Sequence, residues 1–223
     1  MTERLDAVPP EIANAGVRSL LKALLPAFVV SIVHDCRGMP APVALTYVRL
    51  RALRRLGLRS DRAKLRRRPR SLLFVCHGNV MRSPVAAELV RARLGPASPQ
   101  FAIASAGTWT TNGRPADPRA TAVATDLGIS LDSHRSQILT KLMIERSDLI
   151  CVMDFRNEAE LVARFPRAAR KTVLLGGVER HPIGGPAIPD PYMLDADAVS
   201  AIYRRVARAV DALVSRLRPP SDK

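Results

Sequence analysis

Apolar residues along the chain follow two spacings, and from residue 71 onwards the two alternate. Four short apolar runs have the length and composition of buried strands: 71–76, 101–105, 148–153 and 172–175. Apolar residues at helical spacing follow each run: 84–94, 119–127, the residues up to Phe165, and 195–217. Strands that alternate with helices predict a three-layer αβα fold of the α/β class, with a four-stranded parallel sheet covered on both faces. Ligands of such sheets bind at the carboxyl ends of the strands.

The first 70 residues have a different pattern, in which helical stretches are interrupted by proline and glycine. Over residues 43–58, apolar residues recur near helical spacing with arginines between them, which predicts a basic amphipathic helix. Such a helix packs on the rest of a protein, lies on a membrane surface or binds a partner, and packing is the commonest outcome. We therefore expect a basic helical extension and linker at 1–70, followed by an α/β domain at 71–223.

Charge separates the same two regions. The formal net charge is +15, of which residues 1–70 carry +10 and residues 71–223 carry +5. The excess is concentrated in residues 49–70, and a basic stretch of this kind attracts nucleic acid, anionic membrane or an acidic protein surface. A solvated linker is the simpler interpretation and is slightly favoured, because no aromatic residues are interleaved to stack on bases.

The cysteines indicate a reducing compartment. Cys36, Cys76 and Cys151 are far apart, odd in number and in no CxxC or metal-ligand arrangement, so we expect neither a disulfide framework nor a metal site. The first residues include acidic side chains and no basic n-region, and the best apolar run, 23–33, falls short of the roughly 20 residues of a membrane-spanning helix. We expect a cytoplasmic protein without cofactor, associated with a membrane, if at all, through its N-terminal extension.

The candidate chemistry is concentrated in one strand–loop–helix segment, residues 75–84. Gly78 and Asn79 tolerate a positive φ, so successive backbone N–H groups can turn inward and form an anion-binding nest. Ser83 is a favourable N-cap and Pro84 a favourable first residue of a helix, whose dipole then directs its positive end into the same hollow. A dianionic phosphoryl group fits there without a metal.

Two reactive side chains belong to this loop. The planar guanidinium of Arg82 can hold two phosphoryl oxygens, a geometry that lysine does not offer. The N–H groups, the helix N-terminus and the guanidinium together favour the thiolate of Cys76, which is a competent nucleophile towards phosphorus. A buried cysteine at the end of a strand is the plain structural alternative, but the joint placement of Cys, Gly-Asn, Arg and Ser-Pro favours catalysis.

The pattern Cys-x5-Arg-Ser-Pro directly after a first apolar strand resembles the low-molecular-weight protein tyrosine phosphatases. Five further stretches are similar to that family: 105–108, 113–120, 134–137, 148–154 and 188–192. The resemblance covers essentially all of 71–223 and implies that this region is the phosphatase domain, whereas residues 1–70 have no counterpart in the family's usual form. Cys-x5-Arg alone occurs in unrelated phosphatase folds, and its position together with Asp-Pro-Tyr late in the domain selects this family.

The resemblance also implies a role for an aspartate far from the loop. Asp190 is expected to protonate the departing oxygen as general acid and then, as general base, to activate water against the phosphocysteine. Without the resemblance, Asp190-Pro191 is simply a turn and is not distinguished from Asp117-Pro118. The resemblance favours Asp190 and assigns Asp117 a structural role.

The predicted substrate pocket is formed by the loop and two aromatic side chains. Its substrate-binding residues are His77, Gly78, Asn79, Val80, Met81, Ser83, Trp109 and Tyr192. His77 follows the nucleophile, but it is expected to point away from the pocket and is given no chemistry of its own. Trp109 and Tyr192 are expected to sandwich a phenyl ring, although core packing of Trp109 is nearly as well supported.

Polar residues are expected to support the loop from behind. Ser83 is expected to donate a hydrogen bond to the Cys76 thiolate as well as to cap the helix. Asn79 is expected to fix the shape of the loop, and the resemblance pairs it with a histidine that matches His134. A lone histidine is more often structural than catalytic, and His134 is interpreted in that way, with Ser105 as a further support.

The expected substrate is protein phosphotyrosine, by family analogy on a bacterial tyrosine kinase. Members that act on phosphoarginine carry Thr where this chain has Val80, and the apolar Val80 favours an aryl group. An arsenate reductase on the same fold needs two further cysteines on a mobile segment, which Cys36 and Cys151 do not provide. A phosphoprotein-binding or basic anchoring module is the alternative outside enzymes. Many members also carry a second cysteine where this chain has Met81, so an oxidised Cys76 lacks that disulfide partner.

Overall fold

The computed structural model describes residues 32–65 and 68–218. The chain divides into two compact units, Met1–Ala44 and Leu45–Lys223. The described part of the first unit contains helical residues 32–35 and the start of helix α3. The second unit contains the sheet and the candidate chemistry.

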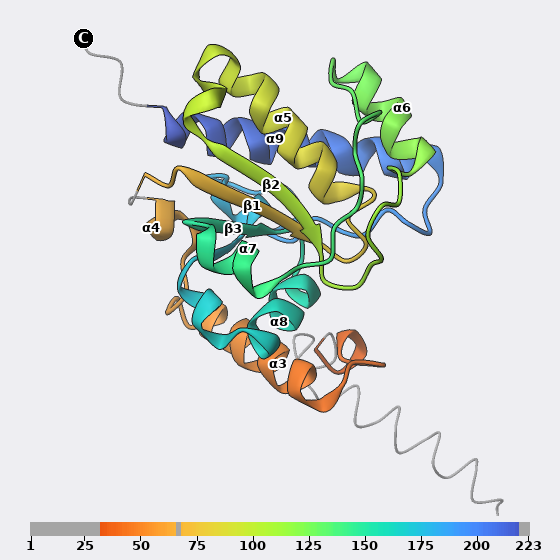
Figure 1. Cartoon of the computed structure of the whole chain (residues 1–223). Helices are drawn as coiled ribbons and strands as arrows, with labels where there is room; N and C mark the ends of the chain where they lie inside the picture. Colours follow the sequence, from red (N-terminus) through yellow and green to blue (C-terminus); the bar gives the residue numbers. More distant parts are fainter. Residues whose placement is uncertain (1–31, 66–67, 219–223) are drawn as a thin grey trace, which may run out of the picture. The chain divides into compact units, whose positions relative to one another are not determined.

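A sheet of four parallel strands forms the centre of the second unit (Figure 1). The strands are β1 (Ser71–Cys76), β2 (Ala102–Gly107), β3 (Leu149–Val152) and β4 (Thr172–Leu174). Their order is β2-β1-β3-β4, so β1 is internal and β4 is an edge strand. All of β3 and all but the first residue of β1 are buried, which explains their continuous apolar sequences. The predicted four-stranded parallel sheet is confirmed.

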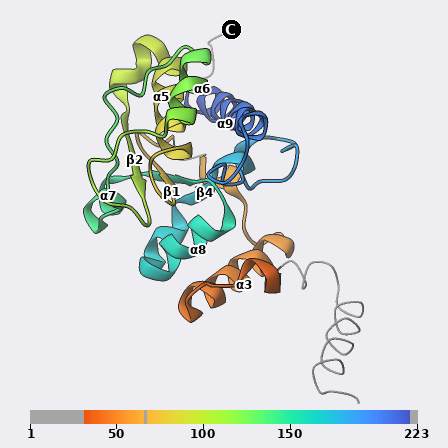
Figure 2. The same cartoon turned by 90° about the vertical axis from the view of Figure 1, so that its right-hand side faces the viewer.

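Helices cover both faces of this sheet (Figures 1 and 2). The α-helices are α3 (Ala41–Arg55), α4 (Asp61–Lys64), α5 (Arg82–Leu94), α6 (Pro118–Asp126), α7 (Lys141–Arg146), α8 (Phe155–Arg164) and α9 (Ala196–Leu217). The 3-10 helices are η2 (Gly95–Gln100), η3 (Pro166–Arg170) and η4 (Leu175–Val178). Side chains of α5, α6 and α9 form the core on one face, while α7 and α8, joined by Leu50 of α3, form the core on the other. The predicted three-layer architecture is confirmed.

The predicted helices occur with shifted ends, and two short helices have no counterpart in the sequence pattern. Helix α5 begins at Arg82, two residues earlier than expected, so Ser83 lies inside the helix and the prediction that it caps the helix is wrong. Helix α3 ends before Gly57, whose φ of +70° is a left-handed conformation that favours glycine. Helices α4 and α7, with four and six residues, are too short to show a helical period.

Within the second unit, helix α3 packs on helix α8. Tyr47 and Leu50 of α3 are buried, and the Tyr47 ring meets Phe155 edge-to-face with ring centroids 6.3 Å apart. Packing is therefore the outcome for the basic amphipathic helix. The domain boundary expected at residue 70 stays a prediction, although the chain from residue 45 onwards belongs to the same compact unit as the sheet.

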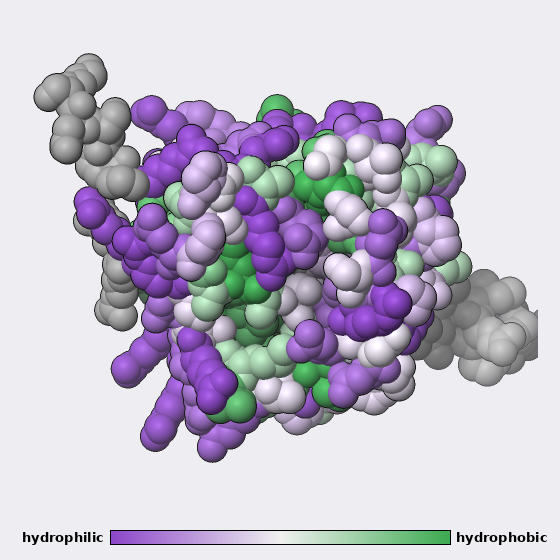
Figure 3. All heavy atoms as spheres, turned by 45° about the horizontal axis from the view of Figure 1, so that its top comes forward, coloured by the Kyte–Doolittle hydropathy of each residue, from purple (hydrophilic) through white to green (hydrophobic). Residues whose placement is uncertain are grey.

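The surface on the side of α5 and α9 is mostly hydrophilic, and its apolar residues form small separate areas (Figure 3). Helix α9 buries the apolar face predicted for it: Val199, Ile202, Val206, Val210, Leu213 and Leu217. In the described part of the chain, no helix combines the length and the apolar composition needed to cross a membrane.

Candidate active site

The loop between β1 and α5 wraps around the sulfur of Cys76 at the carboxyl end of β1. The backbone N–H of Asn79 donates to Sγ over 3.2 Å, and Oγ of Ser83 lies 3.0 Å from the same sulfur. Asn79 has a φ of +50°, a left-handed conformation that turns its N–H inward. The sulfur is therefore held at the centre of the loop, between a backbone N–H and a hydroxyl.

The side chain of Asn79 holds the loop in this conformation. Its Nδ2 donates to Oγ of Ser83 and to Oγ of Ser105, each over 2.9 Å, and its Oδ1 accepts from the N–H of Gln137 over 2.8 Å. The carbonyl oxygen of Asn79 lies 2.7 Å from Nε2 of His134. Both amide donors and the amide oxygen are therefore used, which fixes a backbone conformation that a non-glycine residue rarely adopts. The two expected supports of the loop, Ser105 and His134, both contact Asn79.

The guanidinium of Arg82 is buried between two carboxylates and is only 1% exposed. Nη1 donates to Oδ2 of Asp154 over 2.6 Å and to the carbonyl of Ile188 over 3.0 Å, while Nη2 donates to Oδ2 of Asp190 over 2.6 Å. Burial disfavours the charge, but the negative groups of Asp154, Cys76 and Asp190 outweigh it and raise the pKa of Arg82. Arg82 is therefore a permanent cation whose orientation is fixed by hydrogen bonds.

Asp154 is a site residue that sequence reasoning does not identify. It follows β3, the neighbour of β1, and caps α8 by accepting from the N–H of Asn157 on Oδ1 over 2.8 Å. Its other oxygen, Oδ2, orients Arg82. The sequence does offer one signal that could have identified Asp154. It is an acidic residue shortly after a buried strand, and the carboxyl end of that strand lies beside the carboxyl end of the strand that carries Cys76.

A pocket of about 400 Å³ opens beside the loop. Its lining residues are Cys76, His77, Gly78, Val80, Met81, Arg82, Trp109, Arg114, Asp190, Tyr192 and Met193. Asn79 and Ser83, both predicted to bind substrate, are fully buried and lie outside this lining. Trp109 and Tyr192 are 76% and 52% exposed, which excludes core packing for Trp109. Within the described residues, no group of three or more His, Cys, Asp or Glu side chains is placed to hold a metal ion.

His77 is among the residues that line the pocket, and its imidazole faces Glu160, which is not among them. Its Nδ1 is 3.7 Å from Oε2 of Glu160, a carboxylate of α8 that also accepts from Oγ1 of Thr108 over 2.6 Å. Its interaction with the Glu160 carboxylate raises the pKa of His77. His77 is therefore protonated over a wider pH range than a free histidine and adds positive charge beside the phosphate loop.

The two Asp-Pro pairs of the domain lie in different surroundings. Asp117 caps α6 by accepting from the N–H of Arg119, and the hydrogen bond from the Arg119 side chain lowers the pKa of Asp117. Asp190 lies instead at the pocket, with a side chain that is 47% exposed and bonded to Arg82. The geometry therefore distinguishes two residues that local sequence does not.

Cys151 is not placed to form a disulfide with Cys76. It is in register with Phe74, two residues before Cys76 on the neighbouring strand. Two residues along a strand and one strand across separate the Cα atoms by about 8 Å, which exceeds the roughly 7 Å that a disulfide can span. Burial also raises the pKa of the Cys151 thiol, so Cys151 stays protonated and unreactive.

A thiol nucleophile at a strand end, a nest of backbone N–H groups and a buried arginine define a cysteine-dependent phosphatase site. Comparison with known proteins identifies the family within this class. The model of the family described as "Low molecular weight phosphotyrosine protein phosphatase" matches residues 71–221. The chain belongs to this family, and it is a protein-tyrosine-phosphatase, a phosphoric monoester hydrolase.

Relatives of this chain include phosphatases with more than one substrate class. The protein named "Probable low molecular weight protein-tyrosine-phosphatase EpsP" of Ralstonia nicotianae is 37% identical over 149 residues, which cover 67% of this chain and 97% of the relative. The tyrosine phosphatase AmsI of Erwinia amylovora is 36% identical, and its crystal structure matches 66% of this chain and 92% of AmsI with a TM-score of 0.60. The arginine phosphatase YwlE of Geobacillus stearothermophilus is 31% identical and matches 67% of this chain and 93% of YwlE with a TM-score of 0.60.

Proposed function

We propose that this enzyme hydrolyses phosphotyrosine in proteins through a phosphocysteine formed on Cys76. The observation that carries this proposal is the sulfur of Cys76 at the centre of the loop, with the N–H of Asn79 and the hydroxyl of Ser83 directed at it. The fixed cation of Arg82 supplies the positive charge that a phosphate dianion requires.

In the first step, the loop N–H groups and Arg82 hold the phosphoryl oxygens while the thiolate of Cys76 attacks phosphorus. The bond from sulfur to phosphorus forms as the bond from phosphorus to the tyrosine oxygen breaks. Asp190, at the pocket beside Arg82, gives its proton to that oxygen, so tyrosine leaves as a neutral phenol.

In the second step, Asp190 accepts a proton from water, whose oxygen bonds to phosphorus while the bond from phosphorus to sulfur breaks. Inorganic phosphate leaves, and Cys76 returns to its thiolate form. The hydroxyl of Ser83, 3.0 Å from the sulfur, stabilises the departing thiolate.

The pocket favours an aryl phosphate over phosphoarginine. Val80 contributes an apolar side chain to the lining, and Trp109 and Tyr192 stand exposed at the pocket, where their faces are available to a phenyl ring. A guanidinium would find no hydrogen-bond acceptor on Val80. We expect the wild type to prefer a phosphotyrosine peptide over a phosphoarginine peptide, and Val80→Thr to reduce that preference.

The physiological substrate that we propose is an autophosphorylated bacterial tyrosine kinase in the cytoplasm. This proposal depends on family analogy and on the preference of the pocket for aryl phosphate. It is tested by treating an autophosphorylated bacterial tyrosine kinase with the enzyme and with Cys76→Ser. Loss of phosphotyrosine with the wild type alone supports it, and equal phosphotyrosine in both reactions contradicts it.

We further propose that residues 49–70 make peripheral contact with an anionic membrane surface. The side chains of Arg62 and Arg68 are exposed, and together with Arg216 they line a hollow of about 500 Å³. Proximity to Arg62 adds to burial in lowering the pKa of Arg216, as expected where like charges gather. The contact is supported if the protein is retained on anionic vesicles and Arg62→Gln weakens that retention. It is contradicted if the protein is retained on nucleic acid alone.

The experiment that tests the proposed activity is turnover of p-nitrophenyl phosphate and of a phosphotyrosine peptide in the presence of a chelator. The wild type should turn over both substrates without metal, and Cys76→Ser should turn over neither. Turnover of Cys76→Ser at the rate of the wild type would contradict the mechanism.

A further inference from the structure

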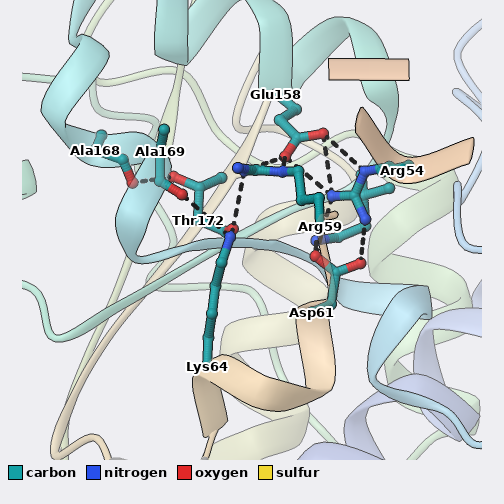
Figure 4. A network of polar contacts seen from close by, with 9 residues as sticks. Arg54, Arg59, Asp61, Lys64, Glu158, Ala168, Ala169 and Thr172 are labelled. Atoms are coloured by element: carbon teal, nitrogen blue, oxygen red, sulfur yellow. Dashed lines mark hydrogen bonds and ion pairs between the residues drawn. The ribbon is translucent and has the colours of Figure 1, made fainter. Parts of the chain in front are cut away.

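A buried polar network joins the last turn of α3 and the segment between α3 and β1 to helix α8 (Figure 4). The side chain of Glu158 in α8 is 0% exposed, and its carboxylate accepts hydrogen bonds from two guanidinium groups. Arg54 donates from Nη2 to Oε1 over 3.0 Å and from Nε to Oε2 over 3.3 Å, while Arg59 donates to Oε1 from Nη2 over 2.5 Å and from Nε over 2.9 Å. A buried carboxylate held by two arginines fixes the position of the helix that bears it.

Asp61 closes the other side of the network. It receives two hydrogen bonds from Arg54, at 2.5 and 3.0 Å, and its Oδ1 accepts from the N–H of Leu174 in the edge strand β4. A Cβ on Gly177 would lie 2.2 Å from Oδ2 of Asp61, so a glycine is required there for the carboxylate to fit. The network therefore anchors Arg54 to the sheet itself, and Arg54 in turn holds α8.

The edge of β4 that pairs with no other strand of the sheet is covered by side chains of the same segment. Lys64 donates from Nζ to the carbonyl of Thr172 over 2.5 Å and to that of Ala169 over 3.1 Å, and Arg59 also reaches Thr172. Burial and the neighbouring Arg59 lower the pKa of Lys64 to about 8. These hydrogen bonds to backbone carbonyls tie the segment to the edge of the sheet.

The first turn of α8 connects this network to the active site. The N–H of Glu158 donates to the carbonyl of Asp154 over 3.1 Å, the first hydrogen bond of the helix. Asp154 in turn holds the helix through Oδ1 and Arg82 through Oδ2. Phe155 is the next residue after Asp154, and the guanidinium carbon of Arg51 lies over its ring, 4.2 Å from the ring centroid. One helical turn is thus fixed by α3 on one side and orients the phosphate-binding arginine on the other.

We propose that Arg54 and Arg59 are positioning residues of the active site. By holding Glu158 they fix the start of α8, and through Asp154 they fix the guanidinium of Arg82 on which phosphate binding depends. This inference rests on the proposed function for the role of Arg82. It makes residues 54–64 part of the catalytic unit and not only a linker.

The test measures phosphate binding separately from stability and from turnover. Arg54→Gln and Arg59→Gln are made singly and together, and Arg167→Gln, an exposed arginine of η3 without a bond to another described residue, is the matched control. The KM for p-nitrophenyl phosphate and the inhibition constant of inorganic phosphate are measured well below the unfolding temperature of each variant. Phosphate affinity is also measured by calorimetry in a Cys76→Ser background, where no turnover is needed.

The double variant should weaken phosphate binding and raise KM by roughly three- to thirtyfold, the range of coupling found between linked sites. The control should match the wild type. Unchanged phosphate affinity with a lowered unfolding temperature would overturn the inference and leave the network a purely structural clamp.

A variant that keeps the shape of the network protects the test against misfolding. Glu158→Gln keeps the shape of the side chain, both guanidinium groups and the pairing of Arg54 with Asp61, but Arg59 then faces a neutral acceptor in place of its carboxylate. It perturbs the same contacts without deleting either arginine and should still weaken phosphate binding. Normal phosphate affinity in Glu158→Gln would also contradict the inference. Absence of turnover in the wild type would instead contradict the proposed function and leave the calorimetric result valid.

Discussion

Replacing Asp154 by Asn separates the orientation of Arg82 from the capping of α8. Asn caps a helix about as well as Asp, so the hydrogen bond from the N–H of Asn157 is retained. The charge that faces the buried guanidinium is lost. A hydrogen bond to a charged group contributes about 1.5–3 kcal/mol, and this one spans 2.6 Å with a partner that is almost fully buried.

If that free energy orients Arg82 for the phosphoryl group, kcat/KM for a phosphotyrosine peptide should fall by about ten- to a hundredfold. If the same 1.5–3 kcal/mol is lost from the stability of the fold, the unfolding temperature should fall by roughly 3–12 °C, because about 1 kcal/mol shifts a domain of this size by roughly 2–4 °C. The assay compares kcat/KM and the unfolding temperature of Asp154→Asn with those of Asp195→Asn. Asp195 caps α9 in the same way, through the N–H of Ala198, and should leave kcat/KM unchanged. A kcat/KM for Asp154→Asn within twofold of the wild type would show that Asp154 does not orient Arg82 for catalysis.

Three further outcomes are expected. Asp190→Asn should lower kcat/KM, which reports formation of the phosphocysteine, by about a hundredfold or more for the phosphotyrosine peptide, the usual contribution of a general acid. It should lower kcat/KM for p-nitrophenyl phosphate much less, because that leaving group needs no proton, and equal losses of kcat/KM would contradict the assignment. Glu160 raises the pKa of His77, so protonated His77 stabilises the fold and attracts phosphate fully at pH values below about 6.5, the ordinary pKa of histidine. Both effects are lost as the pH rises through the raised pKa, and a pH profile of KM that is unchanged by His77→Gln would count against this role. Prolonged peroxide should inactivate the wild type without recovery by thiol, whereas Met81→Cys should recover by forming a disulfide with Cys76; full recovery of the wild type would contradict this prediction.

The strands and long helices of the fold could be predicted because each carries its own period. The run 71–76 is buried on both faces and therefore reads as continuous apolar sequence. The four-residue helix α4 and the six-residue helix α7 complete too few turns to show a pattern, and they are held by tertiary contacts and a cap. The loop from Cys76 to Ser83 could be recognised because its residues are consecutive and each has a local reason to be there.

Residues that act across the sheet could not be predicted in the same way. Asp154 orients Arg82 only because β3 lies beside β1, and the pair is 72 residues apart in sequence. The pairing of Arg54 with Glu158 spans 104 residues, and in the sequence Arg54 is one basic residue among many. Such contacts depend on strand order and helix placement, which local composition does not specify.

The proposed reaction passes through a covalent bond between phosphorus and the sulfur of Cys76. Rapid quenching of the wild type during turnover of a phosphotyrosine peptide, followed by mass spectrometry, measures this directly. We expect one phosphoryl group on the peptide that contains Cys76, formed without metal and lost on the timescale of turnover. Turnover without such an adduct, or an undiminished rate in Cys76→Ser, would contradict the account.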